Sequence, residues 1–432
     1  MDTIKIGLLG LGTVGTGVAK VLINNQESIA KKVGKPVELV KVLVSDTKKH
    51  RSITFPRGII TDNPEELLSN PEIDILVEVI GGINPAKDYI IKALENNKQV
   101  ITANKDLIAT HGKELFTVAQ SKNSDLLFEA SVAGGIPIIR PLKECLAGNK
   151  LEQVMGIING TSNYMLTKMT QEGSGFNEVL KEAQALGYAE VDPTADIEGY
   201  DAARKIAILA SIAFGTRIAF SDVYVEGITK ITPEDIKYAK DLGYVIKLLG
   251  IANCVNDQVE VRVHPTFISK DHPLATINDV FNAIFIKGDA IGEAMFFGRG
   301  AGEMPTASAV VGDIVTAARN IVHGVTGRIS CTCFDEKPVI KIGEVQSEYY
   351  LRLKVADKPG VLASIAGVLA NHDVSIGSVV QKNAGKNGNA EIVLITHKVD
   401  ENSIQDALQI IGGLSIVDAI SNLIRVEGGN KQ

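Results

Sequence analysis

Residues 3–26 read TIKIGLLGLGTVGTGVAKVLINNQ, and this stretch decides the fold of the first part of the chain. The apolar residues that begin at Ile4 predict a short buried strand, and the apolar spacing after Gly15 predicts a helix. Between them lies the spacing Gly10-x-Gly12-x-x-Gly15. A glycine turn that leaves a strand and opens a helix is typical of a dinucleotide-binding domain. The sequence therefore predicts a pyrophosphate at this helix N-terminus, where unpaired N–H groups attract an anion.

Further apolar stretches at residues 37–46, 74–82 and 98–103 predict three more strands, with helical patterns between them. Strands that alternate with helices indicate a parallel, doubly wound sheet, which binds ligands beyond the carboxyl ends of its strands. Lys105 follows the last of these strands. It therefore stands at the expected ligand edge, although its position alone fits an ordinary surface lysine equally well.

The residues after the second strand leave the choice of dinucleotide open. Asp46 stands where an acid binds a ribose 2′-hydroxyl, which favours NAD. Lys48, Lys49 and Arg51 follow directly, and these cations suit the 2′-phosphate of NADP. Both cofactors remain candidates on the residues alone.

Residues 126–139, LLFEASVAGGIPII, predict another apolar strand that breaks at Gly134-Gly135. A glycine pair exposes backbone carbonyls, and with Glu129 nearby these oxygens suit a hard cation. A plain turn is the alternative reading of the same residues.

Residues 190–205, EVDPTADIEGYDAARK, contain five carboxylates and two cations. A helix is expected from Asp201 onward, and it places Asp201 and Lys205 on one face because they are four residues apart. A surface ion pair explains this spacing. The apolar sequence that follows explains it differently, because a lysine shielded among acids in a cleft can transfer a proton. Both readings stay open at this point.

The C-terminal part of the chain differs from the rest. Residues 326–348 are polar and irregular, which indicates a linker. Residues 349–428 then show the order strand, helix, strand, strand, helix, strand. This βαββαβ order predicts a small ferredoxin-like module.

Bulk properties exclude several classes of protein. The net charge is -7 at pH 7, which argues against a nucleic-acid partner. Apolar runs stay short of the roughly 20 residues that a membrane helix needs, and the N-terminus lacks a signal-peptide pattern. The spacing of the four cysteines does not suit a zinc site. The expected protein is cytoplasmic, with reduced thiols.

Several motifs together resemble the homoserine dehydrogenase family. The longest is AQALGYAEVDPTADIEGYDAARK at residues 183–205, a specific signature of that family. The motifs GLLGLGTVG, TANKDL, EASVAGGIP, NGTSNY and GRGAGEMPTAS also match in order. The resemblance covers roughly residues 1–325, and the tail resembles an ACT domain, an amino-acid-sensing module.

The resemblance implies an α/β protein with three domains and the interconversion of L-aspartate 4-semialdehyde and L-homoserine by NAD(P). These reactions serve threonine, methionine and isoleucine biosynthesis. The expected domains are a Rossmann dinucleotide-binding domain (1–130), a mixed α/β catalytic and dimerisation domain (131–325), the linker (326–348) and the ferredoxin-like ACT domain (349–428). The last helix of the catalytic domain, about residues 305–325, is expected to pack back toward the first domain.

Roles for individual residues follow from the resemblance. Lys205 is the expected acid that protonates the aldehyde oxygen, Lys105 is the second candidate for this transfer, and Asp201 orients the substrate. The expected substrate-binding residues are Glu190, Asp201, Thr161, Gly160 and Asp196. The expected cofactor-binding residues are Gly10, Gly12, Thr13, Val14, Gly15, Lys105, Gly187 and Gly302. NADP is the expected cofactor and NAD the alternative, since Ser45-Asp46 replaces the arginine that many NADP-preferring members carry after the second strand.

The resemblance also implies a monovalent cation, sodium, held by Glu129, Val132, Gly134 and Ile136. An amino-acid effector, threonine, is expected at the ACT turn from Asp357 to Leu362, with assembly alone as the alternative role of that module. The chain is expected to form a homodimer or a homotetramer. A non-catalytic sensor that binds NAD(P) and an amino acid is the rival reading, and the Asp201–Lys205 pair argues against it.

Overall fold

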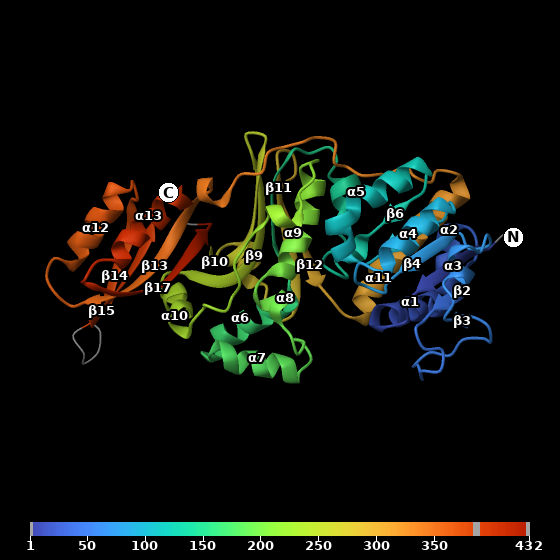
Figure 1. The fold of residues 1–432 in the computed structure, drawn as a ribbon, viewed down its shortest axis with the longest axis horizontal. Coiled ribbons are helices and arrows are strands. Elements are labelled where there is room, and N and C mark those ends of the chain that lie inside the picture. Colours follow the sequence, from blue (N-terminus) through green and yellow to red (C-terminus); the bar gives the residue numbers. More distant parts are fainter. Residues whose placement is uncertain (1–2, 383–388, 429–432) are drawn as a thin grey trace. The chain divides into compact units, whose positions relative to one another are not determined.

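The computed structural model describes residues 3–382 and 389–428. The chain forms two compact units, each built from segments that are distant in sequence (Figure 1). The first unit comprises Met1–Val154, Arg204–Asp222 and Phe281–Lys337. The second unit comprises Met155–Ala203, Val223–Val280 and Pro338–Gln432. Strand β7 (Leu151–Ile157) and helix α9 (Tyr200–Ala213) contribute residues to both units. The domain limits expected from the sequence stay a prediction.

The first unit contains a six-stranded parallel sheet in the order β3-β2-β1-β4-β5-β6. Its elements are β1 (Ile4–Leu9), α1 (Thr13–Asn24), α2 (Gln26–Val33), β2 (Val37–Leu43), β3 (Ile60–Thr61), α3 (Glu65–Leu68), β4 (Ile75–Glu78), α4 (Ala86–Glu95), β5 (Gln99–Thr102), α5 (Lys105–Ser121) and β6 (Leu126–Leu127). The chain order reverses between β1 and β4, which creates the crevice where such sheets bind dinucleotides. The predicted Rossmann fold is confirmed.

Helix α11 (Glu303–His323) completes the core of the first unit, although it comes late in the chain. Its apolar residues from Ala307 to Ala318 lie in one buried cluster with strand β1 and helix α1. Gly17 on α1 permits this close packing, because a Cβ there would stand 2.6 Å from the Glu303 carbonyl oxygen. The first unit also contains the hairpin of β11 (Phe281–Gly288) and β12 (Gly292–Arg299).

The strand expected over residues 126–139 is wrong beyond Leu127. A short 3-10 turn at Glu129–Ser131 follows instead, and Ala133 and Gly134 both adopt left-handed backbone angles. The backbone N–H groups of residues 138–140 donate to the Glu129 carboxylate rather than to a neighbouring strand. The buried carboxylate thus replaces the strand partner that the apolar sequence suggested.

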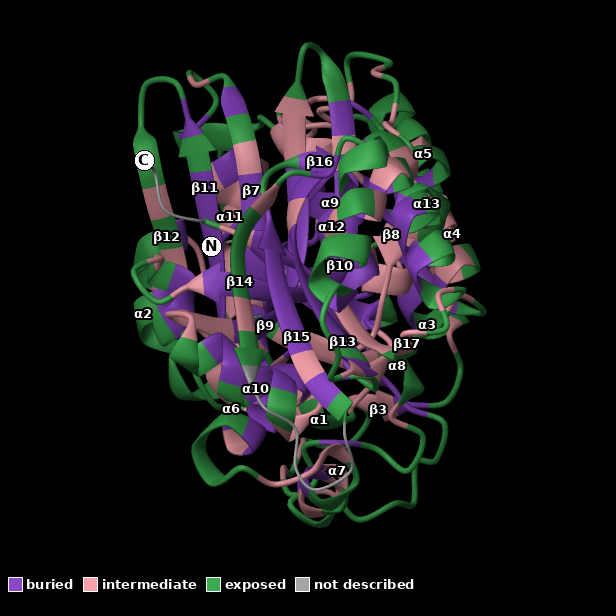
Figure 2. Cartoon of the chain, turned by 90° about the vertical axis from the view of Figure 1, so that its left-hand side faces the viewer, coloured by how far each residue is buried: buried purple, intermediate pink, exposed green. Residues whose placement is uncertain are grey.

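The second unit has a sheet in which the strands β9-β10-β17-β13-β15-β14 lie side by side. Its elements are α6 (Gly160–Glu172), α7 (Phe176–Ala185), α8 (Thr194–Ile197), β8 (Tyr224–Val225), α10 (Pro233–Asp241), β9 (Tyr244–Val255), β10 (Gln258–Ser269), β13 (Gln346–Ala356), α12 (Val361–Asn371), β14 (Ile376–Lys382), β15 (Asn389–Thr396), β16 (Val399–Asp400), α13 (Glu401–Gly412) and β17 (Val417–Glu427). Strands β10, β13 and β15 are buried along most of their length (Figure 2).

The C-terminal module has the predicted ferredoxin-like fold. Its four main strands are ordered β17-β13-β15-β14, and helices α12 and α13 share one apolar core with them. This module is continuous with the rest of the second unit, because β17 pairs in parallel with β10 between Thr266–Ile268 and Arg425–Glu427. The last strand of the module is therefore also an interior strand of a larger sheet.

Asp235, on helix α10, binds the C-terminal module from outside it. This residue is fully buried on α10 and forms a capping box with Thr232. Its carboxylate also accepts hydrogen bonds from Arg352 Nε at 2.8 Å, Tyr350 Oη at 3.1 Å and Asn422 Nδ2 at 2.8 Å. Two strands of the module, β13 and β17, therefore depend on one carboxylate outside it.

Asp235→Ala is expected to lower the free energy of unfolding by roughly 3–5 kcal/mol, because it leaves a buried arginine without its nearest carboxylate. Urea denaturation of the full chain measures this loss. Glu234→Ala, an exposed neighbour on the same helix turn, is the control and should change little. An equal effect of the two substitutions would show that the anchor does not matter.

Candidate functional site

The glycine turn after β1 has three glycines with three different surroundings. Gly10 has φ +102°, a left-handed angle that side chains rarely adopt. At Gly15 a Cβ would overlap the Gly10 carbonyl, so the start of α1 can lie against the turn only with glycine there. A Cβ at Gly12 would meet nothing within 4 Å. The side of the turn at Gly12 is thus open, and no side chain caps the N-terminus of α1. This arrangement suits a dinucleotide pyrophosphate.

The turn after β2 is ordered by its own charged residues. The Asp46 carboxylate accepts the Lys48 backbone N–H at 2.8 Å, and Arg51 donates to the carbonyl oxygens of Asp46 and Lys49. The acid that would favour NAD therefore lies in the same exposed turn as the cations that would favour NADP.

Helix α5 begins at Lys105, directly beyond β5. Asn104 caps this helix by accepting the Leu107 N–H at 3.1 Å. In the same unit, Arg204 of α9 pairs with Asp106 at 2.9 Å. The ion pair joins residues that are adjacent in sequence to Lys205 and Lys105. The structure therefore brings the start of α5 and the turn of α9 at Arg204, which carry the two predicted proton-transfer lysines, to the same region of the first unit.

In the second unit, Asn159 gathers two of the predicted acids. Its Nδ2 donates to the Asp196 carboxylate at 2.7 Å and to the Asp201 carboxylate at 2.9 Å. Its Oδ1 accepts the Ser162 N–H at 2.8 Å and thereby caps α6. The cap of α6 is therefore Asn159 and neither Thr161 nor Ser162. Asn159 and Asp201 are both buried, so two carboxylates meet around one amide in a partly shielded place.

Some of the remaining predicted substrate and cofactor residues lie near the start of helix α6, which Asn159 caps, and others lie elsewhere. Gly160 opens α6, and Thr161 Oγ1 donates to the Tyr188 carbonyl at 2.7 Å. Gly187, next to Tyr188, has φ +75° and belongs to the second unit, whereas Gly302 has φ +122° and precedes α11 in the first. Glu190 is exposed.

The predicted cation residues form a buried loop in the first unit. The Glu129 carboxylate accepts the N–H groups of Ile139 at 2.7 Å and Arg140 at 2.8 Å. Among the residues that the structure describes, no hydrogen bond ends on the carbonyl oxygens of Val132 or Gly134, although both residues are buried. Buried carbonyls normally have a partner. These oxygens therefore fit a hard cation.

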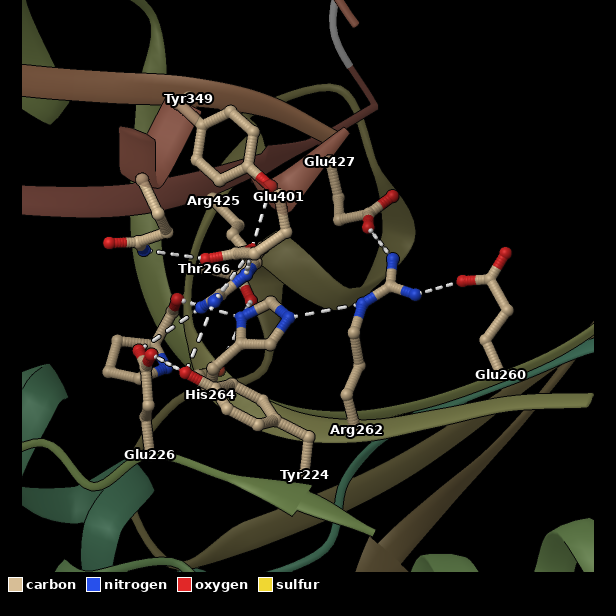
Figure 3. A network of polar contacts seen from close by, with 12 residues as sticks. Tyr224, Glu226, Glu260, Arg262, His264, Thr266, Tyr349, Glu401, Arg425 and Glu427 are labelled. Carbon is tan, nitrogen blue, oxygen red and sulfur yellow. Dashed lines mark hydrogen bonds and ion pairs between the residues drawn. The ribbon is translucent and has the colours of Figure 1, made fainter. Parts of the chain in front are cut away.

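A buried ionic network occupies the junction between β10 and the C-terminal module (Figure 3). The Arg425 side chain is 2% exposed and donates to Glu401 at 2.8 Å and to Glu226 at 3.1 Å. Its guanidinium also lies over the Tyr224 ring, 4.9 Å from the centroid. Nothing in the sequence pattern marked these residues, because their partners are far apart along the chain.

The same network contains a buried histidine. His264 accepts a hydrogen bond from Arg262 Nε at 3.2 Å, and Arg262 also pairs with Glu427 at 2.7 Å. Burial, together with the nearby Arg425 and Arg262, holds the pKa of His264 well below its usual range. The ring is therefore neutral near neutral pH and acts as an acceptor.

The Arg425–Glu226 network extends to the backbone of the segment that carries Asp196 and Asp201. Gly227 follows Glu226, and a Cβ at Gly227 would stand 2.6 Å from Glu198 Cα. The Ile228 N–H donates to the Ile197 carbonyl at 2.8 Å. Residues 197–198 lie between Asp196 and Asp201 in sequence. The backbone between Asp196 and Asp201 thus contacts the residues that follow Glu226, and Glu226 belongs to the network that includes β17.

Gly15→Ala and Gly12→Ala are expected to have different effects. The first forces a backbone overlap and should lower the thermal stability of the chain, whereas the second adds a methyl group in open space and should leave stability unchanged. Gly12→Ala should nevertheless weaken binding of a reduced dinucleotide, measured by fluorescence titration, because its methyl group occupies the pyrophosphate position. Unchanged dinucleotide affinity in Gly12→Ala would contradict the assignment of this turn.

Comparison with known proteins supports the same reading of the fold. Residues 10–129 match the family model for the homoserine dehydrogenase NAD-binding domain, residues 137–315 that for homoserine dehydrogenase, and residues 349–415 that for the ACT domain. No helix among the described residues is long and apolar enough to cross a membrane.

Full-length relatives agree with these matches. The chain is 44% identical over 429 residues to a homoserine dehydrogenase of Bacillus subtilis, with 99% of each chain covered. It is similar to the crystal structure of a homoserine dehydrogenase from Thiobacillus denitrificans, with TM-score 0.94, 44% identity and 99% of each chain covered. A hyperthermophilic archaeal homoserine dehydrogenase in complex with NADPH matches 73% of this chain and 97% of its own, with TM-score 0.61 and 26% identity. The chain therefore belongs to the homoserine dehydrogenase family, and is an oxidoreductase that acts on a CH–OH group.

Proposed function

We propose that this enzyme interconverts L-homoserine and L-aspartate 4-semialdehyde with a nicotinamide dinucleotide, in the biosynthesis of threonine, methionine and isoleucine. The observation that carries the proposal is the Asn159 amide, which donates to both Asp196 and Asp201. Two neighbouring carboxylates make this place negatively charged, and such a place attracts a cation. The ammonium group of a small amino-acid substrate is such a cation.

In this proposal Glu190 and Asp201 bind the substrate ammonium, and Asp196, which accepts from the same Asn159 Nδ2 group as Asp201, adds negative charge. Gly160 and Thr161 open α6, whose N-terminal N–H groups suit the substrate carboxylate. A zwitterionic substrate thereby meets charges of both signs, which compensates the loss of its hydration.

Lys205 is the proposed acid that gives a proton to the aldehyde oxygen, and Lys105 is the second group able to do so. The Arg204–Asp106 ion pair supports this pairing of roles, because it fixes the two helices that carry the lysines in one unit. In the oxidising direction the same lysine takes the proton from the hydroxyl group.

The dinucleotide, when bound, supplies or accepts the hydride. Gly10, Gly12, Thr13, Val14 and Gly15 are proposed to hold its pyrophosphate, and Lys105, Gly187 and Gly302 to contact the rest. We propose NADP as the preferred cofactor, with Lys48 or Lys49 at the 2′-phosphate. Support comes from the exposed basic turn after β2 and from the archaeal relative, which is described with NADPH.

We further propose that Glu129, Val132, Gly134 and Ile136 hold a sodium ion that fixes their loop and takes no part in the chemistry. The support is the set of buried carbonyls described above. Threonine is the proposed effector at the turn from Asp357 to Leu362, and the cytoplasm is the proposed location.

A homodimer or homotetramer is the proposed assembly. Met295 and Phe297 are exposed large apolar residues on β12, which is the last strand at one edge of its sheet. An exposed apolar edge of this kind suits a subunit contact.

The function is tested by following nicotinamide absorbance during homoserine oxidation, with NADP or NAD, with sodium or potassium, and with or without threonine. Lys205→Met should lower kcat by about 10²–10⁴-fold, because it removes the proton-transfer group. Dinucleotide affinity should persist in this variant. Lys113→Met, which changes an exposed lysine on α5, is the control and should retain full turnover.

The outcomes of this assay separate the proposals. Turnover that survives in Lys205→Met but not in Lys105→Met would transfer the proton step to Lys105. Folded wild-type enzyme that binds a dinucleotide without turning over homoserine would support an amino-acid sensor instead.

Gly227→Ala should raise the KM for L-homoserine about tenfold, equivalent to roughly 1.4 kcal/mol, because the added methyl group displaces the backbone at Glu198. The KM for the dinucleotide should not change. Gly175→Ala is the matched control, since its Cβ meets nothing within 4 Å. An unchanged homoserine KM in folded Gly227→Ala would show that the contact with residues 197–198 does not position the acids.

A further inference from the structure

Two cysteines of the first unit lie beside a small cavity that the proposed reaction does not use. Cys331 and Cys333 border a space of about 40 Å³ between α5 and α9. Ile108 and Ala109 of α5, and Ile208 and Ser211 of α9, are among the residues that line it. The space is large enough for a molecule the size of water or a peroxide.

The segment that carries the cysteines is fixed to the end of α9. The Asp335 N–H donates to the Gly215 carbonyl at 2.9 Å, and the Lys337 N–H donates to Thr216 Oγ1 at 3.0 Å. The Lys143 ammonium donates to the Ser330 carbonyl at 3.1 Å. Hydrogen bonds on both sides of the pair thus set the position of its two sulfur atoms.

Two cations face this pair. Arg217 Nη2 lies 3.3 Å from Cys331 Sγ. Lys143 lies over the rings of Phe116 and Phe128, at 5.2 Å and 4.9 Å from their centroids, and is shielded there from water. A sulfur atom next to a guanidinium and a half-buried ammonium is stabilised as the thiolate.

The two cysteines also differ from each other. The Cys333 thiol and its backbone N–H both donate to the Cys331 sulfur, and these bonds, with Arg217 and Lys143, lower the pKa of Cys331 to about 5. The same bond raises the pKa of Cys333, because its proton is held by a neighbouring thiolate. At neutral pH the pair is therefore one thiolate and one thiol in contact.

A metal site does not explain this pair. Among the described residues there is no group of three histidine, cysteine or acidic side chains that could hold a metal ion. Two adjacent sulfur atoms with opposite protonation states are instead typical of thiol redox chemistry.

We propose that Cys331 is a modification site for small electrophiles and hydrogen peroxide, and that Cys333 resolves the oxidised form as an intramolecular disulfide. The Cys331 thiolate attacks one peroxide oxygen, the O–O bond breaks, and a proton completes the water that leaves, so that a sulfenic acid remains. The Cys333 thiol then displaces the sulfenic oxygen as a second water. Peroxide is the oxidant, and the two sulfur atoms together lose two electrons.

This site lies against the helices of the proposed active site. Lys105 opens α5 one turn before Ile108, and Lys205 is on α9 one turn before Ile208. An adduct or disulfide at Cys331 displaces atoms that contact both helices, and turnover falls as a result. This consequence depends on the proposed function, whereas the reactivity of Cys331 does not.

The test compares the four cysteines within one folded chain. Intact enzyme is treated with limiting iodoacetamide at about pH 6.5, below the ordinary thiol pKa of roughly 8.5, and alkylation of each cysteine is followed by mass spectrometry. Cys331 should react at least about tenfold faster than Cys145, which is more exposed. Equal rates, or a faster Cys145, would overturn the proposal.

Peroxide gives a second readout on the same protein. The peptide with Cys331 and Cys333 should lose two hydrogen atoms, and a thiol reductant should restore them. In Cys333→Ser the sulfenic acid should persist and be trapped by dimedone, whereas Cys331→Ser should show neither product. Oxidation of Cys145 or Cys254 ahead of this pair would contradict the assignment.

Arg217→Gln tests the cause of the reactivity. This variant should slow alkylation of Cys331 at about pH 6.5 and leave the rate at Cys145 unchanged. Turnover measured alongside distinguishes the two proposals: modification of Cys331 without loss of turnover would keep the site and remove its effect on the active site.

Discussion

The two hydrogen bonds of the Asn159 amide are the constraint on which the proposed chemistry depends. One Nδ2 group donates to Asp196 and to Asp201. Without it, two carboxylates would separate to lower their repulsion, and the start of α9 would lose its position relative to α6. The amide is neutral, so it brings the carboxylates together without cancelling their charge. In the proposed function, the substrate ammonium is a cation that these carboxylates attract. The proposed arrangement favours substrates that carry an amino group.

A partly buried ion pair and a close backbone contact connect the segment that carries Asp196 and Asp201 to the ACT module. Arg425, on strand β17 of the module, donates a hydrogen bond to Glu226. Gly227, which follows Glu226, packs on the backbone of Ile197 and Glu198. Breaking a buried ion pair leaves an uncompensated charge, so the network resists partial rearrangement. A ligand that moves β17 must then move Glu226 as well. Because β17 also pairs with β10, the same strand belongs to the ACT module and to the neighbouring sheet. A shift of β17 therefore affects both.

The sequence predicted the features that depend on neighbouring residues. The glycine turn follows from a local conflict between backbone atoms at Gly10 and Gly15, so its spacing alone reveals it. The ferredoxin-like module is evident for the same reason, from the order of short apolar segments. Asn159 and Arg425 were missed because their partners lie 42 and 199 residues away. The strand expected at residues 126–139 failed for a related reason, since the buried Glu129 carboxylate competes with strand pairing in a way that apolar composition does not show.

In the first unit, helices α5 and α9 carry the two proposed lysines and also border the cysteine pair. Near the start of α5 and α9, the Arg204–Asp106 ion pair holds the turns that carry Lys205 and Lys105. Farther along the same helices, Ile108 and Ile208 border the cavity at Cys331. In the proposed function, proton transfer requires donor and acceptor within hydrogen-bond reach, so shifts of about 1 Å are sufficient to slow it. The two proposals together therefore place the cysteine pair and the two lysines on the same two helices, where a covalent change at Cys331 is expected to affect turnover.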